Sequence, residues 1–188
     1  MIDIPIYTKQ GDDGKSYIPA FKGVKVPKSH IVFEVIGTID ELNSFIGLAR
    51  SKLGQYKELA KLCEELRRVQ INLFRIGALI AKARTISECI DESENKWIED
   101  RIDYYYGVTP TDKFILPGGH EVASMLHITR TVCRRLERRI VALSESVPSL
   151  VCGGIIKYIN RLSDYFYVIA LYVNRVLGVR EEEVKIEF

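Results

Sequence analysis

Three arginines recur at every fourth position of one predicted helix, and together they could bind an anion. Arg130, Arg134 and Arg138 fall on one side of that helix, with Glu137 beside them. Like charges four residues apart destabilise a helix by about 0.2–0.5 kcal/mol per pair, so a bound anion would relieve their repulsion. A solvated basic face is the alternative interpretation. The predicted core-facing stripe lies on another side of the helix and consists of Thr129, Val132, Leu136, Ile140 and Leu143.

A glycine-containing segment near the N-terminus could bind phosphate. Gly11 and Gly14 would let backbone N–H groups approach an anion, and neighbouring lysines and Ser16 would add donors. The segment is not a P-loop, because that motif needs four residues between its glycines and a helix directly after it. Here two residues separate the glycines, and Pro19 prevents an early helix. A flexible N-terminal tail is the alternative interpretation.

A polar patch interrupts the apolar pattern of the last predicted helix. Asn160 and Asp164 are four residues apart and therefore share a face. Polar groups placed in an apolar helix must find hydrogen-bonding partners. The arginine helix is the predicted partner, which would bring the two polar groups of residues into one site.

Five segments show the apolar periodicity of helices that would position these groups. Thr38-x-x-Glu41 has the form of a capping box, which makes Thr38 the predicted N-cap of the first helix. Residues 1–30 are predicted to be irregular and residues 180–188 to form a frayed tail. The helical segments run from near Thr38 to Gly54, from about Tyr56 to Ala83, from about Ser93 to Gly107, from the Pro117–Gly119 turn past Leu143, and from near Ser149 to about Leu177.

The composition is that of one globular domain spanning residues 1–188. The chain has 188 residues, of which 47% are hydrophobic, and this suffices for one core. We therefore predict an all-α, ferritin-like five-helix bundle over about 37–177, preceded by an irregular arm over residues 1–30. The net charge of the chain is only +2, so we do not expect the broad basic surface that is typical of nucleic-acid-binding proteins. Without a signal peptide or an apolar stretch of about 20 residues, we expect a cytoplasmic protein with no membrane partner.

Cysteine and histidine spacing gives little sign of a metal site. The Glu-x-x-His pairs of di-iron bundles do not occur in the sequence. His120-Glu121 begins like H-E-x-x-H, but position 124 is serine, so we expect no transition metal held by protein ligands. The cysteines are far apart and form no C-x-x-C pair, so reduced and mostly buried thiols are expected at Cys63, Cys89, Cys133 and Cys152.

Four sequence blocks combine these motifs in a fixed order. They are Tyr7-Thr8-Lys9-x-Gly11-Asp12-x-Gly14, then Gly37-Thr38-x-Asp40-Glu41-Leu42-Asn43, then Phe114-x-Leu116-Pro117-Gly118-Gly119 leading to Arg130-x-x-x-Arg134-Arg135-x-Glu137-Arg138, and finally Asn160-Arg161-Leu162-Ser163-Asp164. Together they resemble the PduO-type ATP:cob(I)alamin adenosyltransferases, also called corrinoid adenosyltransferases. The chain departs from that pattern at Ser16, where threonine is usual, and at Val32 and Leu171, where arginine is common. The last two departures put peripheral charge contacts in doubt.

The resemblance implies a five-helix subunit in a homotrimer, with active sites between neighbouring subunits. It implies transfer of the 5′-deoxyadenosyl group from ATP to the cobalt of a reduced corrinoid, with triphosphate as the leaving group. Cob(I)alamin is itself the nucleophile, so the protein would position it. Mg²⁺ would lie on the phosphates, and a flavoprotein reductase and an adenosylcobalamin-dependent enzyme would be partners. By resemblance, the ATP contacts would be Thr8, Lys9, Gly11, Asp12, Gly14, Ser16, Lys28, Arg134, Glu137, Arg138 and Asn160.

The same resemblance assigns catalytic roles to Asp40, Arg130 and Phe114. Asp40 and Arg130 would pair across subunits, with Glu41 and Asp164 supporting the site. Phe114 would cover the lower face of the corrin and keep an axial ligand off the cobalt, which makes reduction to Co(I) easier. The alternative for Phe114 is an ordinary core residue, whose replacement by alanine would cost about 3–5 kcal/mol.

Two other functional classes remain open on the sequence. A non-catalytic chaperone or sensor could bind ATP and a corrinoid on the same scaffold. An RNA-binding helical protein could use the arginine side, although it would lack the aromatic residues and general basicity that such binding favours.

Overall fold

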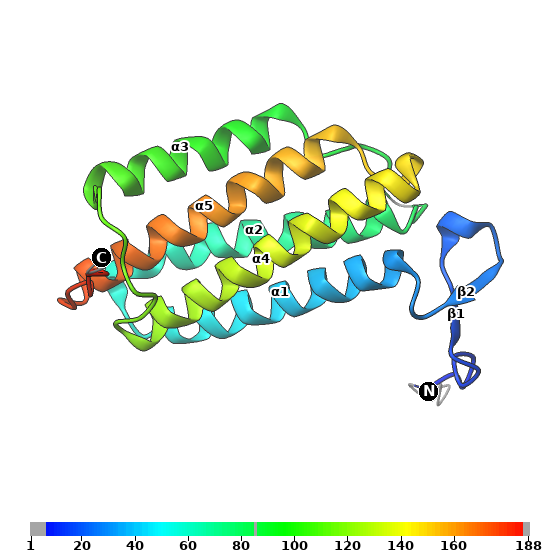
Figure 1. Cartoon of the computed structure of the whole chain (residues 1–188), viewed down its shortest axis with the longest axis horizontal. Helices are drawn as coiled ribbons and strands as arrows, with labels where there is room; N and C mark the ends of the chain where they lie inside the picture. The colour runs from blue at the N-terminus through cyan, green and yellow to red at the C-terminus, as the bar shows by residue number, and fades with distance from the viewer. Residues whose placement is uncertain (1–6, 85, 186–188) are drawn as a thin grey trace.

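The computed structural model describes residues 7–84 and 86–185, and five long helices account for most of this chain. They form a bundle, which confirms the predicted all-α class, and a small N-terminal hairpin lies at one end of it (Figure 1). Within the described residues, none of the helices combines the length and apolarity that a membrane crossing needs. The helices are α1 (Ile31–Leu53), α2 (Ala60–Ile80), α3 (Glu92–Val108), α4 (Glu121–Ser146) and α5 (Gly153–Val176).

The helices α1, α2, α4 and α5 surround one core, and α3 lies outside α5. α1 packs against α2 and α4, while α5 packs against α3 and α4 (Figure 1). Side chains of α2 also reach α5, where the Asn72 amide donates a hydrogen bond to the Tyr158 hydroxyl at 3.2 Å. α4 keeps one side open to solvent, on which Ile128, Arg134 and Arg138 are exposed.

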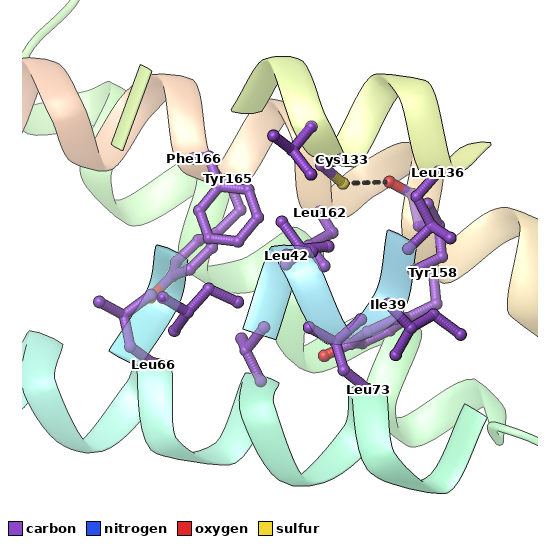
Figure 2. Packing of buried hydrophobic residues seen from close by; sticks show 14 of the residues in the cluster. Ile39, Leu42, Leu66, Leu73, Cys133, Leu136, Tyr158, Leu162, Tyr165 and Phe166 are labelled. Atoms are coloured by element: carbon purple, nitrogen blue, oxygen red, sulfur yellow. Dashed lines mark hydrogen bonds between the residues drawn. The ribbon is translucent and has the colours of Figure 1, made fainter. Parts of the chain in front are cut away.

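Large aliphatic and aromatic side chains fill the core (Figure 2). Leu42 of α1, Leu73 of α2, Leu136 of α4 and Leu162 of α5 are all 0% exposed. Each buried side chain of this size stabilises the fold by about 1.5–3 kcal/mol. The predicted core stripe of α4 is confirmed, because all five of its residues are buried: Thr129, Val132, Leu136, Ile140 and Leu143.

The N-terminal arm contains a short antiparallel hairpin, so the prediction of an irregular segment is wrong there. β1 (Lys15–Tyr17) pairs with β2 (Lys25–Pro27), and a 3₁₀ turn (Pro19–Phe21) lies between them. Ile18 is 4% exposed and belongs to the core cluster. The backbone N–H of Ala20 donates to the carbonyl of Ala81 at 3.0 Å, which ties the hairpin to the end of α2.

The first helix begins seven residues before the predicted N-cap, since it starts at Ile31 and not near Thr38. His30 caps it, with its Nδ1 accepting a hydrogen bond from the backbone N–H of Val32 at 3.2 Å. Thr38 lies inside the helix, where its hydroxyl bonds back to the carbonyl of Glu34. The turns before Thr38 stay helical because they bury apolar side chains such as Val32 and Val35, both 0% exposed.

The cysteine prediction is wrong for two of the four residues. Cys89 and Cys152 form a disulfide, whereas Cys63 and Cys133 are free. The connection before α3 approaches the start of α5 very closely, and a Cβ at Gly154 would lie 2.2 Å from the carbonyl oxygen of Ile90. Glycine permits this approach, which brings the two cysteines together. The spacing of the cysteines in the sequence does not predict this disulfide.

The remaining helix boundaries shift by a few residues. α3 begins at Glu92, because the Asp91 carboxylate accepts the N–H of Glu94 at 3.0 Å and caps the helix two residues before Ser93. Two further 3₁₀ turns, Lys57–Leu59 and Pro148–Leu150, precede α2 and α5. α5 therefore starts at Gly153 and not near Ser149.

Candidate active site

The open side of α4 presents Arg134 and Arg138 to solvent. Both side chains are exposed, and neither forms an ion pair with any described residue of the chain. The Arg138 guanidinium donates to the carbonyl of Arg134 at 3.1 Å, which holds the two residues together. Their planar forks are free to bind the oxygens of a phosphate in a bidentate manner. We call Arg130, Arg134, Glu137 and Arg138 the arginine side of α4.

The neighbouring arginines of α4 have a structural role instead. Arg135 forms an ion pair with Glu41 of α1. Arg139 forms one with Glu34, also of α1, at 2.8 Å. Buried apolar side chains such as Leu42 and Leu136 pack α4 against α1 and thereby set the direction in which Arg134 and Arg138 point, and these exposed pairs add little to that packing. Glu41, which was predicted to support the site, lies in this contact.

The polar patch of α5 meets the arginine side, as predicted. The Asn160 amide N–H donates to Glu137 Oε1 at 2.7 Å, and the side-chain oxygen Oδ1 of Asn160 accepts from Arg161 at 2.7 Å. Arg161 also donates to Glu99 of α3 at 3.2 Å. Asp164 lies close to this network; burial raises the pKa of its carboxyl, and the charges of Arg161 and Arg134 oppose that rise. A chain of hydrogen bonds thus holds Glu137 at the edge of the open side.

Arg130 differs from Arg134 and Arg138 because it is half-buried. Its Nε has no hydrogen-bond partner among the described residues. One turn earlier, His127 is 3% exposed, and neither of its ring nitrogens has a described partner. Burial, and after it the charge of Arg130, lowers the pKa of His127 to about 4, so its imidazole is neutral at pH 7. A hollow of about 260 Å³ opens beside it, lined by Pro117, Ser124, His127, Ile128 and Thr131.

His127 is a residue that the sequence reasoning missed. It lies three residues before Arg130 on the same helix. Residues three apart are neighbours on a helix surface, so this spacing was the available signal. The structure adds the burial of the ring, which spacing cannot show.

Asp40 and Arg130 do not meet within one chain. Asp40 is exposed on α1 and forms no ion pair with a described residue. It borders a groove of about 440 Å³ between α1 and α2, whose lining includes Gly37, Leu73 and Phe74. Phe74 is 69% exposed, which leaves an apolar patch at this groove. Two charged residues that were predicted to pair are therefore both without a described ionic partner.

The glycine segment of the arm is a loop whose polar groups bond mainly to one another. Lys28 Nζ donates to the carbonyl of Gly11 at 2.8 Å, and its backbone N–H donates to the carbonyl of Gly14 at 2.9 Å. Gly14 has φ 73°, a left-handed conformation that favours glycine. Lys25 pairs with Asp13 at 3.0 Å, and its hydrogen bond lowers the pKa of that carboxyl.

Among the described residues, no side-chain hydrogen bond joins the predicted ATP contacts of the arm to those of the helices. For the described residues before His30, all side-chain hydrogen bonds stay within residues 10–28. None joins the arm to the arginine side of α4. The two groups of predicted ATP contacts are Thr8, Lys9, Gly11, Asp12, Gly14, Ser16 and Lys28 in the arm, and Arg134, Glu137, Arg138 and Asn160 in the bundle.

Phe114 lies in the loop before α4, and its side chain is 82% exposed. The interpretation as a core residue is therefore wrong. The backbone of its loop is nevertheless held, because the carbonyl of Phe114 accepts the N–H of Val184 at 2.8 Å. The predicted frayed tail thus pairs with this loop over its described residues, with an isolated bridge between Ile115 and Glu183.

The arm and the Phe114 loop lie at opposite ends of the bundle (Figure 1). The arm precedes the first residue of α1, whereas the start of α4 lies beside the end of α1. There, Lys52 forms an ion pair with Glu121 at 3.2 Å, and the Tyr56 hydroxyl lies 3.2 Å from His120 Nε2. α1 has 23 residues, so the two parts are separated by about 35 Å at 1.5 Å per residue.

Comparison with known protein families identifies relatives of this chain. The model, described as cobalamin adenosyltransferase, matches residues 6–173. The chain belongs to the cobalamin adenosyltransferase family. A corrinoid adenosyltransferase of Bacillus subtilis is 41% identical over 95% of this chain and 91% of its own. The corrinoid adenosyltransferase MMAB of Mus musculus is 37% identical over 94% of this chain and 76% of its own.

Solved structures of another adenosyltransferase share the fold. One is an arginine-to-lysine variant of a PduO-type ATP:corrinoid adenosyltransferase from Lactobacillus reuteri complexed with ATP, with a TM-score of 0.86, 35% identity, and coverage of 96% of this chain and 100% of that one. A phenylalanine-to-histidine variant complexed with cobalamin and ATP has a TM-score of 0.87 and 34% identity, over 96% of this chain and 97% of that one. Val32 and Leu171, where the resemblance led us to expect arginine, are both buried here, at 0% and 3% exposure.

Proposed function

We propose that this ATP:corrinoid adenosyltransferase assembles its active site between copies of the chain. The arm of one copy would bind ATP together with the arginine side of α4 of the next copy. The observation that carries the proposal is the separation of the arm from Phe114 by the length of α1. ATP held by the arm could not reach a corrinoid over the Phe114 of the same chain, whereas the arm of a neighbouring copy can lie beside it.

The exposed groups of both parts suit a triphosphate. Its negative charge must be stabilised as it leaves, and fixed cations and N–H donors do this best when they are in place beforehand. Arg134 and Arg138 offer unpaired guanidinium groups on a helix that is already anchored. Lys28 and the N–H groups around Gly11 and Gly14 would supply the second half of the phosphate site.

The residues present are compatible with Mg²⁺ bound to the nucleotide. Magnesium usually takes one or two carboxylates together with phosphate oxygens and water. Glu137 is the carboxylate on the arginine side, and its Oε1 is oriented by Asn160. Glu137 would therefore hold the cation, which neutralises phosphate charge when bound.

Phe114 would form the wall beneath the corrin. Its ring is exposed to solvent and does not belong to the core. The ring could therefore exclude water or a base from the lower face of the cobalt. In the reaction, the Co(I) electron pair attacks C5′ of ATP, the Co–C bond forms, and the C5′–O bond breaks as triphosphate leaves. The substituted phenylalanine and arginine of the Lactobacillus reuteri structures are as far apart along their chain as Phe114 and Arg134 are here, which supports this assignment.

Assembly into a homotrimer would bring the unpaired charges together. Asp40 of one copy would pair with the half-buried Arg130 of the next, and the apolar patch around Phe74 would be covered nearby. A flavoprotein reductase would supply Co(I), and an adenosylcobalamin-dependent enzyme would take up the product. Both are proposed as partners on the strength of the family.

The activity is tested by incubating the protein with ATP and chemically reduced cobalamin. We expect the absorption spectrum of an alkylcobalamin, with one triphosphate released for each Co–C bond. A chaperone or sensor would bind both ligands without forming that bond. Absence of product with bound ATP and bound cob(I)alamin would therefore favour the non-catalytic alternative.

A further inference from the structure

The C-terminal segment Arg180–Val184 lies against the loop that carries Phe114. We propose that this segment positions Phe114 beneath the corrinoid and so makes it effective as a wall. The inference rests on the proposed role of Phe114. Because the Phe114 side chain is 82% exposed, packing within the chain cannot set its position. Its backbone must be fixed by other means.

The backbone pairing supplies that fixation on both sides of Phe114. The Val184 N–H donates to the carbonyl of Phe114 at 2.8 Å, and the Leu116 N–H donates to the carbonyl of Glu182 at 2.8 Å. These bonds surround the antiparallel bridge between Ile115 and Glu183. Two bonds that flank one bridge define the direction in which successive side chains point.

A buried amide anchors both partners of this pairing to α5. Asn174 is 0% exposed, and its Nδ2 donates to the carbonyl of Gly118 at 3.1 Å and to Glu181 at 2.9 Å. Its Oδ1 accepts the backbone N–H of His120 at 2.8 Å. Asn174 thus holds the far end of the Phe114 loop and the near end of the C-terminal segment at one point.

The glycine of the turn lets the loop come this close. Gly119 has φ 93°, and a Cβ there would lie 2.4 Å from Asn174 Nδ2. A side chain would therefore push the loop off its anchor. The ion pair between Lys113 and Glu183, at 2.6 Å, is exposed on both sides. Exposed pairs contribute little, so the backbone bonds and Asn174 carry the positioning.

This arrangement predicts a defect that depends on the oxidation state of the cobalt. A displaced Phe114 would let an axial ligand return to the lower face of cob(II)alamin, which makes its reduction harder. Cob(I)alamin supplied ready-made needs no such step. Loss of the C-terminal pairing should therefore impair turnover from cob(II)alamin and largely spare turnover from cob(I)alamin.

The matched test replaces one residue of the C-terminal segment in two ways. Val184→Pro removes the N–H that bonds Phe114, whereas Val184→Ala removes only side-chain atoms and keeps it. A chain ending at Val179 loses the whole segment, and a chain ending at Lys185 retains the described pairing. Phe114→Ala serves as the reference for loss of the wall. For each protein we would measure ATP binding, the fraction of bound cob(II)alamin without an axial nitrogen by electron paramagnetic resonance, and turnover from both oxidation states.

We expect Val184→Pro and the chain ending at Val179 to behave like Phe114→Ala. Turnover from cob(II)alamin should fall by up to about a hundredfold, which a misplacement of about one ångström can cause, and the axial nitrogen should reappear. Val184→Ala and the chain ending at Lys185 should match the parent. If Phe114→Ala is impaired but Val184→Pro and the chain ending at Val179 are not, the inference is wrong and the wall stands. If Phe114→Ala itself behaves like the parent, the wall and the inference fail together.

Discussion

The arm and the arginine side of α4 are proposed to grip the same nucleotide, yet they are built in opposite ways. Arg134 and Arg138 lie on a long helix whose buried side packs against α1 and α5. The arm is a short exposed hairpin whose lysines bond to its own carbonyls and carboxylates, as Lys28 does with Gly11. One part is already in place for an anion, and the other must first release internal bonds.

Because of this difference, we expect α4 to determine how tightly phosphate is bound and the arm to determine how the protein responds to ATP. The helical part loses little conformational entropy when phosphate binds, because its backbone is already fixed. The glycine loop of the arm must exchange internal hydrogen bonds, such as that of Lys28 with Gly11, for bonds to ATP, so the conformation of this loop would depend on the ligand. We therefore expect substitutions on α4 to change transition-state binding and substitutions in the arm to change the response to ATP.

The largest expected effect is on assembly. Asp40→Arg would leave the half-buried Arg130 of the next copy facing a like charge, and like charges placed together across an interface are strongly unfavourable. Turnover should be nearly lost and the oligomer weakened, as seen by light scattering after size-exclusion chromatography. Combining Asp40→Arg with Arg130→Asp should restore part of both. A double-mutant cycle with no coupling energy would rule out the pairing.

The next largest effect is on stability in acid, and it belongs to the bundle. The pKa of His127 is about 4 in the folded chain and about 6.5 when unfolded. Above pH 6.5 the residue is neutral in both states. Between pH 6.5 and 4 only the unfolded chain binds the proton, so stability falls as pH falls, by up to about 3 kcal/mol.

The variant His127→Phe isolates this contribution from the carboxylates that titrate in the same range. Urea unfolding of both proteins at several pH values should show a flatter pH dependence for the variant. Parallel curves for the two proteins would show that His127 is not held neutral by its surroundings. The ion pair of Asp13 with Lys25 in the arm is exposed to solvent, so Asp13→Asn should change the curve much less than His127→Phe does.

A smaller effect is expected on the chemistry of the arginine side. Arg134→Lys keeps the charge but loses the planar fork, and kcat/KM for ATP should fall at least about tenfold, or roughly 1.4 kcal/mol. Arg139→Lys is the matched control on the same helix, because Arg139 pairs with Glu34 within the chain. Equal effects of the two substitutions would remove Arg134 from the site.

The smallest effect on free energy is expected in the arm. There, ATP should change protection from proteolysis more than it changes the free energy of unfolding. Limited proteolysis of the free protein should cut within residues 8–28 and leave the bundle intact. MgATP should slow that cleavage several-fold while changing the unfolding of the helices little. Cleavage at equal rates with and without MgATP would show that the arm does not order on the nucleotide.

Local patterns predicted much of the bundle but not its boundaries. Helical periodicity identified five helices, and the polar patch at Asn160 did find Glu137. The capping-box pattern at Thr38 was misleading because burial of Val32 and Val35 extends α1 beyond it. Tertiary packing overrides a local cap signal when apolar spacing continues on the other side.

The contacts that hold the Phe114 loop could not be predicted, because they join segments far apart in sequence. The backbone N–H of Val184 donates a hydrogen bond to the carbonyl of Phe114, and the Asn174 amide donates to the carbonyl of Gly118 and to the Glu181 carboxylate. Neither the C-terminal segment nor Asn174 shows a pattern that marks a partner. The Cys89–Cys152 disulfide is of the same kind, since only the close approach at Gly154 brings the cysteines together.

The central claim is that the arm of one copy serves the arginine side of another, and mixed oligomers test it most directly. One variant carries Lys9→Ala and Lys28→Ala in the arm, and the other carries Arg134→Ala and Arg138→Ala on α4. Each should be nearly inactive alone. If the arm acts in the neighbouring copy, random mixing rebuilds about a quarter of the sites, since each half of a site is intact with even odds.

We would co-express the two variants, isolate the mixed oligomers and measure adenosylcobalamin formation from ATP and cob(I)alamin. The account predicts recovery of about a quarter of the parent's activity at equal amounts of the two chains. If each arm instead served its own chain, every site would keep one defect. Activity no higher than the mean of the two separate variants would contradict the account.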